Sequence, residues 1–142
     1  MITMASPNPF VHPRWGLTFH WWAVDPSGEV ALIYSAFGQV PWAANSQVQV
    51  IDSATKAARA NYPGWFAEAR PTGPAPYRFE WDEECDDHYT RVESPALPIL
   101  ITDLPDKIAQ AAGLVRVAFS FRDITRIDLA YPDGEEALSA RY

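Results

Sequence analysis

The sequence predicts an α+β domain with a mostly antiparallel β-sheet, an N-terminal β-hairpin and about two helices packed on one face. Three observations support this prediction. Two aromatic or β-branched segments flank a tight turn, two later segments have helical spacing, and the other apolar segments are short. With 142 residues, 48% of them hydrophobic, the chain is expected to form a single domain, residues 1–142, with its own core.

The hairpin comes first along the chain. The aromatic run "WGLTFHWWAV", residues 15–24, is typical of a strand. The four residues Asp25–Gly28 then supply turn chemistry, because proline fixes φ at the second position and glycine accepts a positive φ. The second strand is predicted over residues 29–37, "EVALIYSAF".

A helix is predicted from Asn45 or Ser46 to about Asn61, after residues 38–45 leave the sheet. Pro63 and Gly64 end it and begin a proline-rich loop that extends to residue 76. The apolar positions of this helix have the spacing of one inner face: Val48, Ile51, Ala54, Ala58 and Tyr62.

The second half of the chain alternates short strands with one helix. Thr102 or Asp103 is expected to cap that helix and Gly113 to stop it, with Ile108 and Ala112 facing inward. Strands are predicted at residues 77–81 and 88–94. Residues 97–101 are a short buried strand or the entry to one, and residues 114–121 and 125–131 give one or two final strands. Residues 1–12 and 133–142 are expected to be flexible tails.

The charge of the chain restricts its partners. Eleven basic and eighteen acidic residues give a net charge of −7, and only Lys56 and Lys107 are lysines. Nucleic acid is an unfavourable partner, because its binding requires neutralisation of phosphates by Lys and Arg. A basic protein surface is the better electrostatic match.

Cysteine content and hydropathy indicate the compartment. Cys85 is the single cysteine, so no internal disulfide can form, and the N-terminus has no signal-like segment. No run approaches the roughly eighteen apolar residues that a membrane span needs. The sequence therefore predicts a cytoplasmic protein that does not enter the membrane.

The nucleotide-binding and nucleophile motifs are missing. The chain has neither a G-x-G-x-x-G nor a G-x-x-x-x-G-K-[ST] motif, and "YSAFG" lacks the first glycine of a G-x-S-x-G elbow. His20 has no neighbouring nucleophile, and Cys85 is surrounded by carboxylates that would raise its pKa. We therefore predict no catalytic residue, no cofactor and no enzyme activity.

The densest polar cluster is "EWDEECDDHY", residues 80–89. It can be a solvated acidic turn between two strands, an acidic recognition patch, or a metal site. Cys85 and His88 have C-x-x-H spacing, which zinc could use with neighbouring carboxylates, although a second Cys/His pair is missing nearby. No metal is predicted, and Cys85 with His88 remains the alternative.

Adjacent tryptophans complete the set of candidate partner-binding residues. Trp21 and Trp22 point to opposite faces of their strand, so one of them is expected to be exposed unless both faces are covered. Exposed aromatics beside acidic groups are typical anchors of protein interfaces. The residues predicted to bind a partner are Trp21, Trp22, Trp81, Asp82, Glu83, Glu84, Asp86 and Asp87.

The segment "HWWAVDPSGEVALIYSAFGQVP" resembles the N-terminal hairpin of small actinobacterial and other bacterial proteins associated with polymorphic toxin systems as immunity proteins. The later "TDLPDKIAQAAGLVRVAFSF" resembles their C-terminal segment. The resemblance implies toxin binding and no catalytic residue. Its pattern corresponds here to Ala23, Asp25, Gly28, Val30, Ala31, Tyr34, Ser35, Gly38, Val40 and Pro41.

These observations favour a non-enzymatic cytoplasmic binding module, an immunity-type protein that neutralises a basic toxin or effector through an acidic, tryptophan-containing surface. One alternative is a small metalloprotein or hydrolytic enzyme that uses Cys85, His88 and nearby carboxylates. Another is a structural subunit whose aromatic surface is buried in a homo-oligomer.

Overall fold

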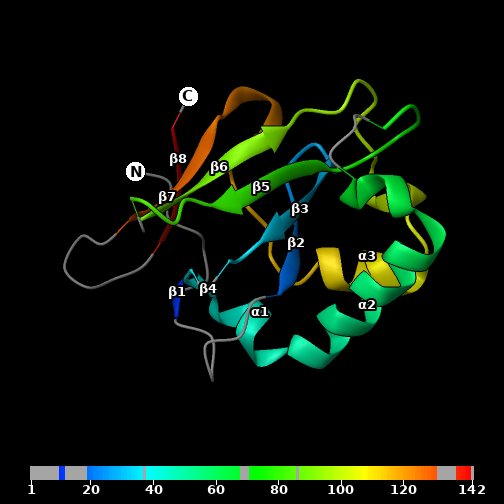
Figure 1. The fold of residues 1–142 in the computed structure, drawn as a ribbon, viewed down its shortest axis with the longest axis horizontal. Coiled ribbons are helices and arrows are strands. Elements are labelled where there is room, and N and C mark those ends of the chain that lie inside the picture. The colour runs from blue at the N-terminus through cyan, green and yellow to red at the C-terminus, as the bar shows by residue number, and fades with distance from the viewer. Residues whose placement is uncertain are drawn as a thin grey trace.

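The computed structural model describes residues 10–11, 19–36, 38–67, 71–85, 87–130 and 137–141. It confirms the predicted α+β class: the helices gather along one side of a curled sheet (Figure 1). The main sheet has the order β2-β3-β5-β6-β7-β8. Its strands are β2 (His20–Val24), β3 (Val30–Tyr34), β5 (Tyr77–Trp81), β6 (His88–Glu93), β7 (Arg126–Ala130) and β8 (Ala137–Arg141).

The remaining elements surround this sheet. A second, two-stranded sheet pairs β1 (Phe10–Val11) with β4 (Val40–Pro41). The α-helices are α1 (Trp42–Ser46), α2 (Val48–Asn61) and α3 (Asp106–Ala112), and the 3₁₀ helices are η2 (Pro63–Phe66), η3 (Ile101–Asp103) and η4 (Phe121–Asp123). No helix in the described part of the chain combines the length and the apolar character that a membrane span requires.

The predicted hairpin is formed by β2 and β3, which pair antiparallel from His20↔Tyr34 to Val24↔Val30. The turn is set by Asp25, whose Oδ1 accepts the N–H groups of Ser27 and Glu29, both at 2.9 Å. Gly28 has a φ of 85°, a conformation that a residue with a Cβ rarely adopts. The local sequence therefore determines the hairpin register.

The same turn is tied to a distant segment. The second oxygen of Asp25 accepts the N–H of Phe121 at 3.1 Å, although the carboxyl group is buried and burial raises its pKa. Glu29, also buried, accepts hydrogen bonds from Arg122 at 2.7 Å and from the Tyr77 hydroxyl at 3.1 Å. These bonds fasten η4 against the hairpin turn.

One strand pair is parallel, which makes the sheet mixed. β3 pairs with β5 from Ala31↔Tyr77 to Tyr34↔Glu80. A parallel pair needs a long crossover connection, and α1, α2 and η2 supply it. The crossover places α2 and η2 over the face of the sheet that carries Trp22.

Trp21 and Trp22 are both completely buried, on opposite faces of β2. The Trp21 indole N–H donates to the Tyr89 hydroxyl at 3.3 Å, and that hydroxyl donates to the Gln39 carbonyl at 2.5 Å. The Trp22 indole N–H donates to Thr55 of α2 at 3.2 Å. The prediction that Trp21 or Trp22 contacts a partner is therefore wrong, because both side chains are enclosed in the core.

The helices agree with the predicted inner faces but differ at their ends. Ile51, Ala54 and Ala58 are buried on α2, as are Ile108 and Ala112 on α3. The structure starts α2 at Val48 and α3 at Asp106, later than the predicted caps, and neither helix has a side-chain cap. Residues 101–103 form η3 instead.

Of the two segments predicted to give one or two final strands, residues 125–131 contain β7, whereas residues 114–121 form no ladder with described residues, and neither do residues 97–101. Residues 114–121 show alternating burial, but only Val24↔Arg116 forms a bridge, with the N–H of Val24 donating to Val115 and that of Val117 donating to Val24. Residues 97–101 make isolated bridges from Pro98 and Leu100. Residues 114–121 lie beside the edge strand β2, and residues 97–101 contact the residues that precede β3 and β5. Neither contact is long enough to form a ladder.

Parts of the two segments expected to be flexible tails form strands, and the rest of them, residues 1–9, 12, 133–136 and 142, lies outside the described residues. Residues 10–11 form β1, and residues 137–141 form β8, which pairs with β7 from Arg126↔Arg141 to Ala130↔Ala137. The polar composition after Pro132 gave no strand signal. The pairing uses main-chain groups of an edge strand, which composition does not reveal.

Gly38→Ala should destabilise the fold by about 2 kcal/mol or more, because a Cβ at this position would overlap the buried Trp81 indole ring. Gly64→Ala is the matched control, since a Cβ there meets nothing within 4 Å, and it should change stability by less than about 1 kcal/mol. Urea unfolding measures both. Equal stability of the two variants would contradict the close packing of Gly38 on Trp81.

Candidate functional site

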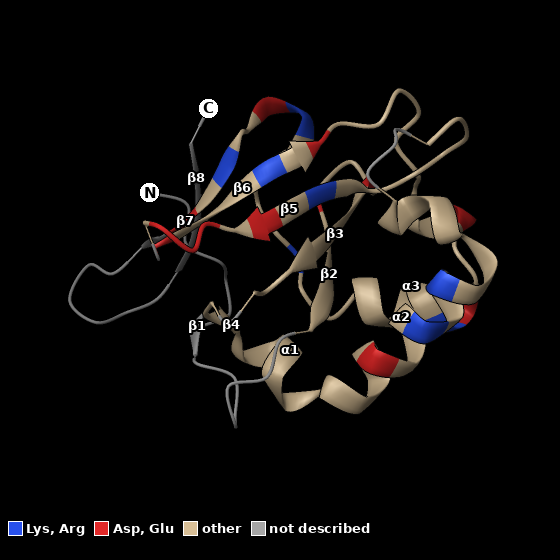
Figure 2. Ribbon diagram, in the orientation of Figure 1, with Lys and Arg blue, Asp and Glu red and all other residues tan. Residues whose placement is uncertain are grey.

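The acidic loop, defined here as residues 82–87, connects the antiparallel strands β5 and β6. Figure 2 shows it as the acidic turn that joins these strands. Asp82 shapes the turn, because its Oδ1 accepts the N–H groups of Glu84 at 3.0 Å and Cys85 at 2.9 Å. These hydrogen bonds, led by the one from Cys85, lower the pKa of Asp82, so its carboxylate stays charged.

Most side chains of the acidic loop face solvent. Glu83, Glu84, Cys85 and Asp87 are exposed, and neither Glu83 nor Glu84 forms an ion pair with a described residue. Asp86, also predicted to bind a partner, lies outside the described residues. Glu83 and Glu84 therefore present carboxylates that form no ion pair with a described cation.

Trp81 does not join this surface. It is only 5% exposed, and its ring packs edge-on against Tyr89 with a centroid distance of 4.9 Å. The prediction that Trp81 contacts a partner is wrong, because its side chain points into the core while Glu80 and Asp82 on either side point away from it.

Cys85 is a poor nucleophile in this setting. The charge of Asp82, followed by burial and the charges of Asp87 and Glu84, raises the pKa of the thiol. The thiol form therefore dominates at neutral pH, and the reactive thiolate is scarce.

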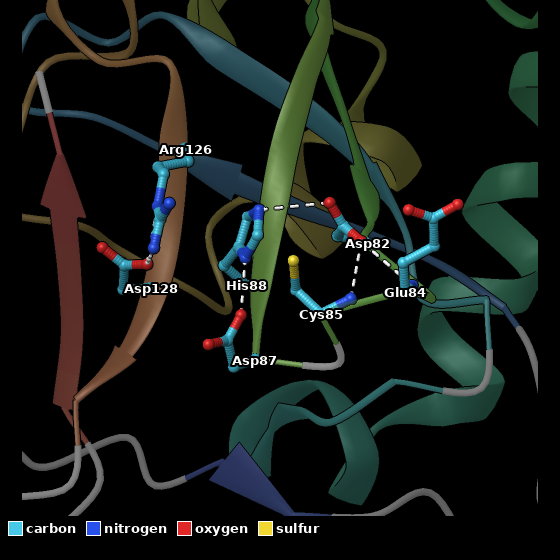
Figure 3. Close-up of polar contacts among 7 residues, drawn as sticks. All are labelled: Asp82, Glu84, Cys85, Asp87, His88, Arg126 and Asp128. Carbon is cyan, nitrogen blue, oxygen red and sulfur yellow. Dashed lines mark hydrogen bonds and ion pairs between the residues drawn. The ribbon is translucent and has the colours of Figure 1, made fainter.

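His88 brings a second donor type to the loop. It is buried, and its Nδ1 lies 2.6 Å from Asp87 Oδ1 while its Nε2 lies 3.4 Å from Asp82 Oδ2. The Cys85 sulfur points into the space between the His88 ring and the Asp82 carboxylate (Figure 3). Donor atoms of Asp82, Cys85 and His88 all lie within 4.8 Å of one another. The C-x-x-H spacing thus brings together a carboxylate, a thiol and an imidazole.

A cavity of about 260 Å³ lies on the sheet face next to α2 and η2. The cavity could not be predicted from local sequence patterns, because its walls come from β2, β3, α2, η2, β5 and β6. The residues that line it are His20, Leu32, Tyr34, Arg59, Trp65, Phe66, Arg78, Phe79, Glu80 and Val92. The one usable signal was the alternation in "YRFEW", which puts Arg78 and Glu80 on the face opposite the buried aromatics.

His20 lies between two arginines of this cavity and is uncharged at neutral pH. Burial, followed by the charges of Arg59 and Arg78, lowers its pKa to about 4. Its ring packs against Tyr34 at 4.9 Å and against Phe66 at 5.3 Å between centroids. His20 is therefore a neutral hydrogen-bonding group at the wall of the cavity.

Comparison of the chain with models of known protein families, with curated proteins and with solved structures gave no match.

His20 should make folding sensitive to acid. Its pKa is about 4 in the folded protein against 6.5 for a free imidazole, so protonation favours the unfolded chain. The contribution of His20 to the unfolding free energy is therefore intact above pH 6.5 and declines as the pH falls toward 4. Between pH 7.5 and pH 5, the wild type should lose about 2 kcal/mol more unfolding free energy than His20→Gln.

Urea unfolding of both proteins at the two pH values measures this difference. Arg59, Arg78 and Glu80 share the cavity with His20, and Asp52 and Lys56 line an adjoining one. Because these groups are present in both proteins, the comparison isolates the imidazole. Equal losses in the two proteins would show that His20 titrates normally.

Proposed function

We propose that the protein is a non-enzymatic cytoplasmic binding module that holds a basic protein partner through the acidic loop. The observation that carries the proposal is the exposure of Glu83, Glu84 and Asp87 on one tight turn. Glu83 and Glu84 have no cation partner among the described residues, so their charge is available to a partner. The net charge of −7 adds long-range attraction for a basic surface.

The loop suits this role because hydrogen bonds hold the backbone of Asp82, Glu84 and Cys85 in place. Asp82 accepts two main-chain hydrogen bonds inside the turn, and the N–H of Asp82 donates to the His88 carbonyl at 2.9 Å. A turn fixed in this way presents its carboxylates with little loss of conformational entropy on binding. The resemblance to immunity proteins of toxin systems makes a basic toxin or effector the proposed partner.

Removing the two unpaired charges should weaken the complex through its association rate. Glu83→Gln/Glu84→Gln should slow association about tenfold at low salt and reduce the dependence of the rate on salt. The control, Asp103→Asn/Asp106→Asn, removes two exposed carboxylates elsewhere and should behave like the wild type. The partner is first identified by capture from a lysate of the native host. Surface plasmon resonance of the purified pair then measures the association rates.

We expect the wild type and the control to retain a basic protein, and the loop variant to release the same protein at a lower salt concentration. Retention of the same protein to the same salt concentration by all three would exclude the acidic loop as the binding surface. A partner that is itself acidic would contradict the proposal.

The second candidate function is metal binding by the same loop, and the convergence of Asp82, Cys85 and His88 favours it. Oxygen, nitrogen and sulfur ligands on one tetrahedral zinc ion lie about 3.4–3.6 Å apart. The 3.4 Å between Asp82 Oδ2 and His88 Nε2 matches that separation. Asp87 contacts the other nitrogen of His88, as a carboxylate does behind many histidine ligands of zinc.

Three protein ligands would leave one position open for water or a substrate group. Titration of the purified protein with Co²⁺ should then give thiolate-to-metal absorption, and Zn²⁺ should displace the cobalt. Cys85→Ser and His88→Gln should each reduce zinc affinity at least about tenfold, whereas Glu93→Gln should not change it. Cobalt spectra without a thiolate band would exclude Cys85 as a ligand and with it this candidate.

A further inference from the structure

We infer that the cavity beside α2 and η2 binds a small organic anion, with its carboxylate or phosphate group against Arg59 and Arg78 and a flat apolar body against the aromatic walls. This site is separate from the acidic loop. It also requires a ligand of opposite charge to the proposed protein partner.

Two arginines line this cavity, and neither forms an ion pair with a described residue. In an acidic protein with only eleven Lys and Arg residues, Arg59 and Arg78 both line one cavity. Arg122 and Arg126 are paired with Glu29 and Asp128, but neither cavity arginine forms an ion pair with a described residue. A guanidinium group binds carboxylate and phosphate oxygens through paired hydrogen bonds, which suits it to an anion.

Arg78 supplies the second argument. One terminal nitrogen donates to the Trp65 carbonyl at 3.3 Å, which holds the side chain against η2. Its Nε is buried and has no hydrogen-bond partner. A buried donor without an acceptor costs free energy, so Arg78 brings an incompletely satisfied guanidinium group to the wall of this cavity.

Arg59 is held over the same cavity from α2. Its guanidinium carbon lies 4.6 Å from the centroid of the Phe66 ring, and one terminal nitrogen lies 3.4 Å from His20 Nδ1. Because His20 is neutral, that ring nitrogen can accept a hydrogen bond from the guanidinium without adding a charge. The groups that orient Arg59, the Phe66 ring and the neutral His20 ring, therefore carry no negative charge.

The size and walls of the cavity define the rest of the ligand. A dry cavity of about 150 Å³ is enough to bind benzene, and the volume here is about 260 Å³. Leu32, Tyr34, Trp65, Phe66 and Val92 supply apolar and aromatic surface around the two arginines. The space therefore fits one ring that carries an anionic group.

Glu80 is the opposing charge at this site. It is exposed, lines the same cavity and forms no ion pair with either arginine. Its carboxylate must repel a bound anion, so its removal should strengthen binding. This gives the test a variant with a predicted gain as well as variants with predicted losses.

The test measures binding of benzoate, phenyl phosphate and the uncharged benzamide to the full chain, by isothermal titration calorimetry and by NMR of the Trp65 indole. Benzoate or phenyl phosphate should bind saturably and shift the Trp65 signal, and the tighter of the two identifies the preferred oxyanion. Arg59→Gln and Arg78→Gln should each weaken anion binding at least about tenfold. Glu80→Gln should strengthen it several-fold and leave benzamide binding unchanged.

Arg116→Gln is the matched control, because Arg116 is exposed and does not line the cavity, yet its loss changes the net charge equally. It should bind the anions like the wild type.

Arg59 is exposed on α2, so Arg59→Gln keeps the test valid even if Arg78→Gln fails to fold. No saturable binding of either anion overturns the proposal, as does equal binding by wild type, Arg59→Gln and Arg116→Gln. Because no residue of the acidic loop is changed, failure here leaves the protein-binding proposal standing, and the reverse also holds.

Discussion

Two adjacent tryptophans on an edge strand impose the constraint on which the rest of the fold depends. Trp21 and Trp22 point to opposite faces of β2, so both faces must be covered to bury them. Tyr89 and the Gln39 carbonyl complete one side, while Thr55 and Trp65 close the other. The crossover from β3 to β5 is what brings α2 and η2 to the second side, and the parallel strand pair is its topological consequence.

The same constraint decides where recognition can occur. Because Trp21, Trp22, Trp65 and Trp81 are buried in the core, these tryptophans are not available for binding, and both candidate sites carry charged groups at the surface. The turn that joins β5 and β6 carries carboxylates beyond the ends of these two strands (Figure 2). On the helical side, η2 places Trp65 against Trp22 and Tyr62, and the neighbouring sheet face stays open as the cavity of Arg59 and Arg78. An acidic loop and a basic cavity thus occur on one small domain.

Local patterns predicted the class and the hairpin, since Asp25 and Gly28 act within one turn. They could not predict that Asp25 also accepts the N–H of Phe121, because that contact depends on the tertiary fold. The alternating segment 114–121 looked like a strand, yet it pairs with β2 at Arg116 alone. The acidic loop was visible as composition, whereas the cavity required Arg59 and Arg78 to meet across the crossover.

The most direct test of this account is hydrogen exchange of the Trp21 and Trp22 indole N–H groups, followed by NMR. Both donate hydrogen bonds inside the core, so both should exchange only through global unfolding, at rates that follow the unfolding free energy measured in urea. Fast exchange of either indole in the native protein would mean that one face of β2 is open. An aromatic interface on the hairpin would then replace the charged loop as the recognition surface.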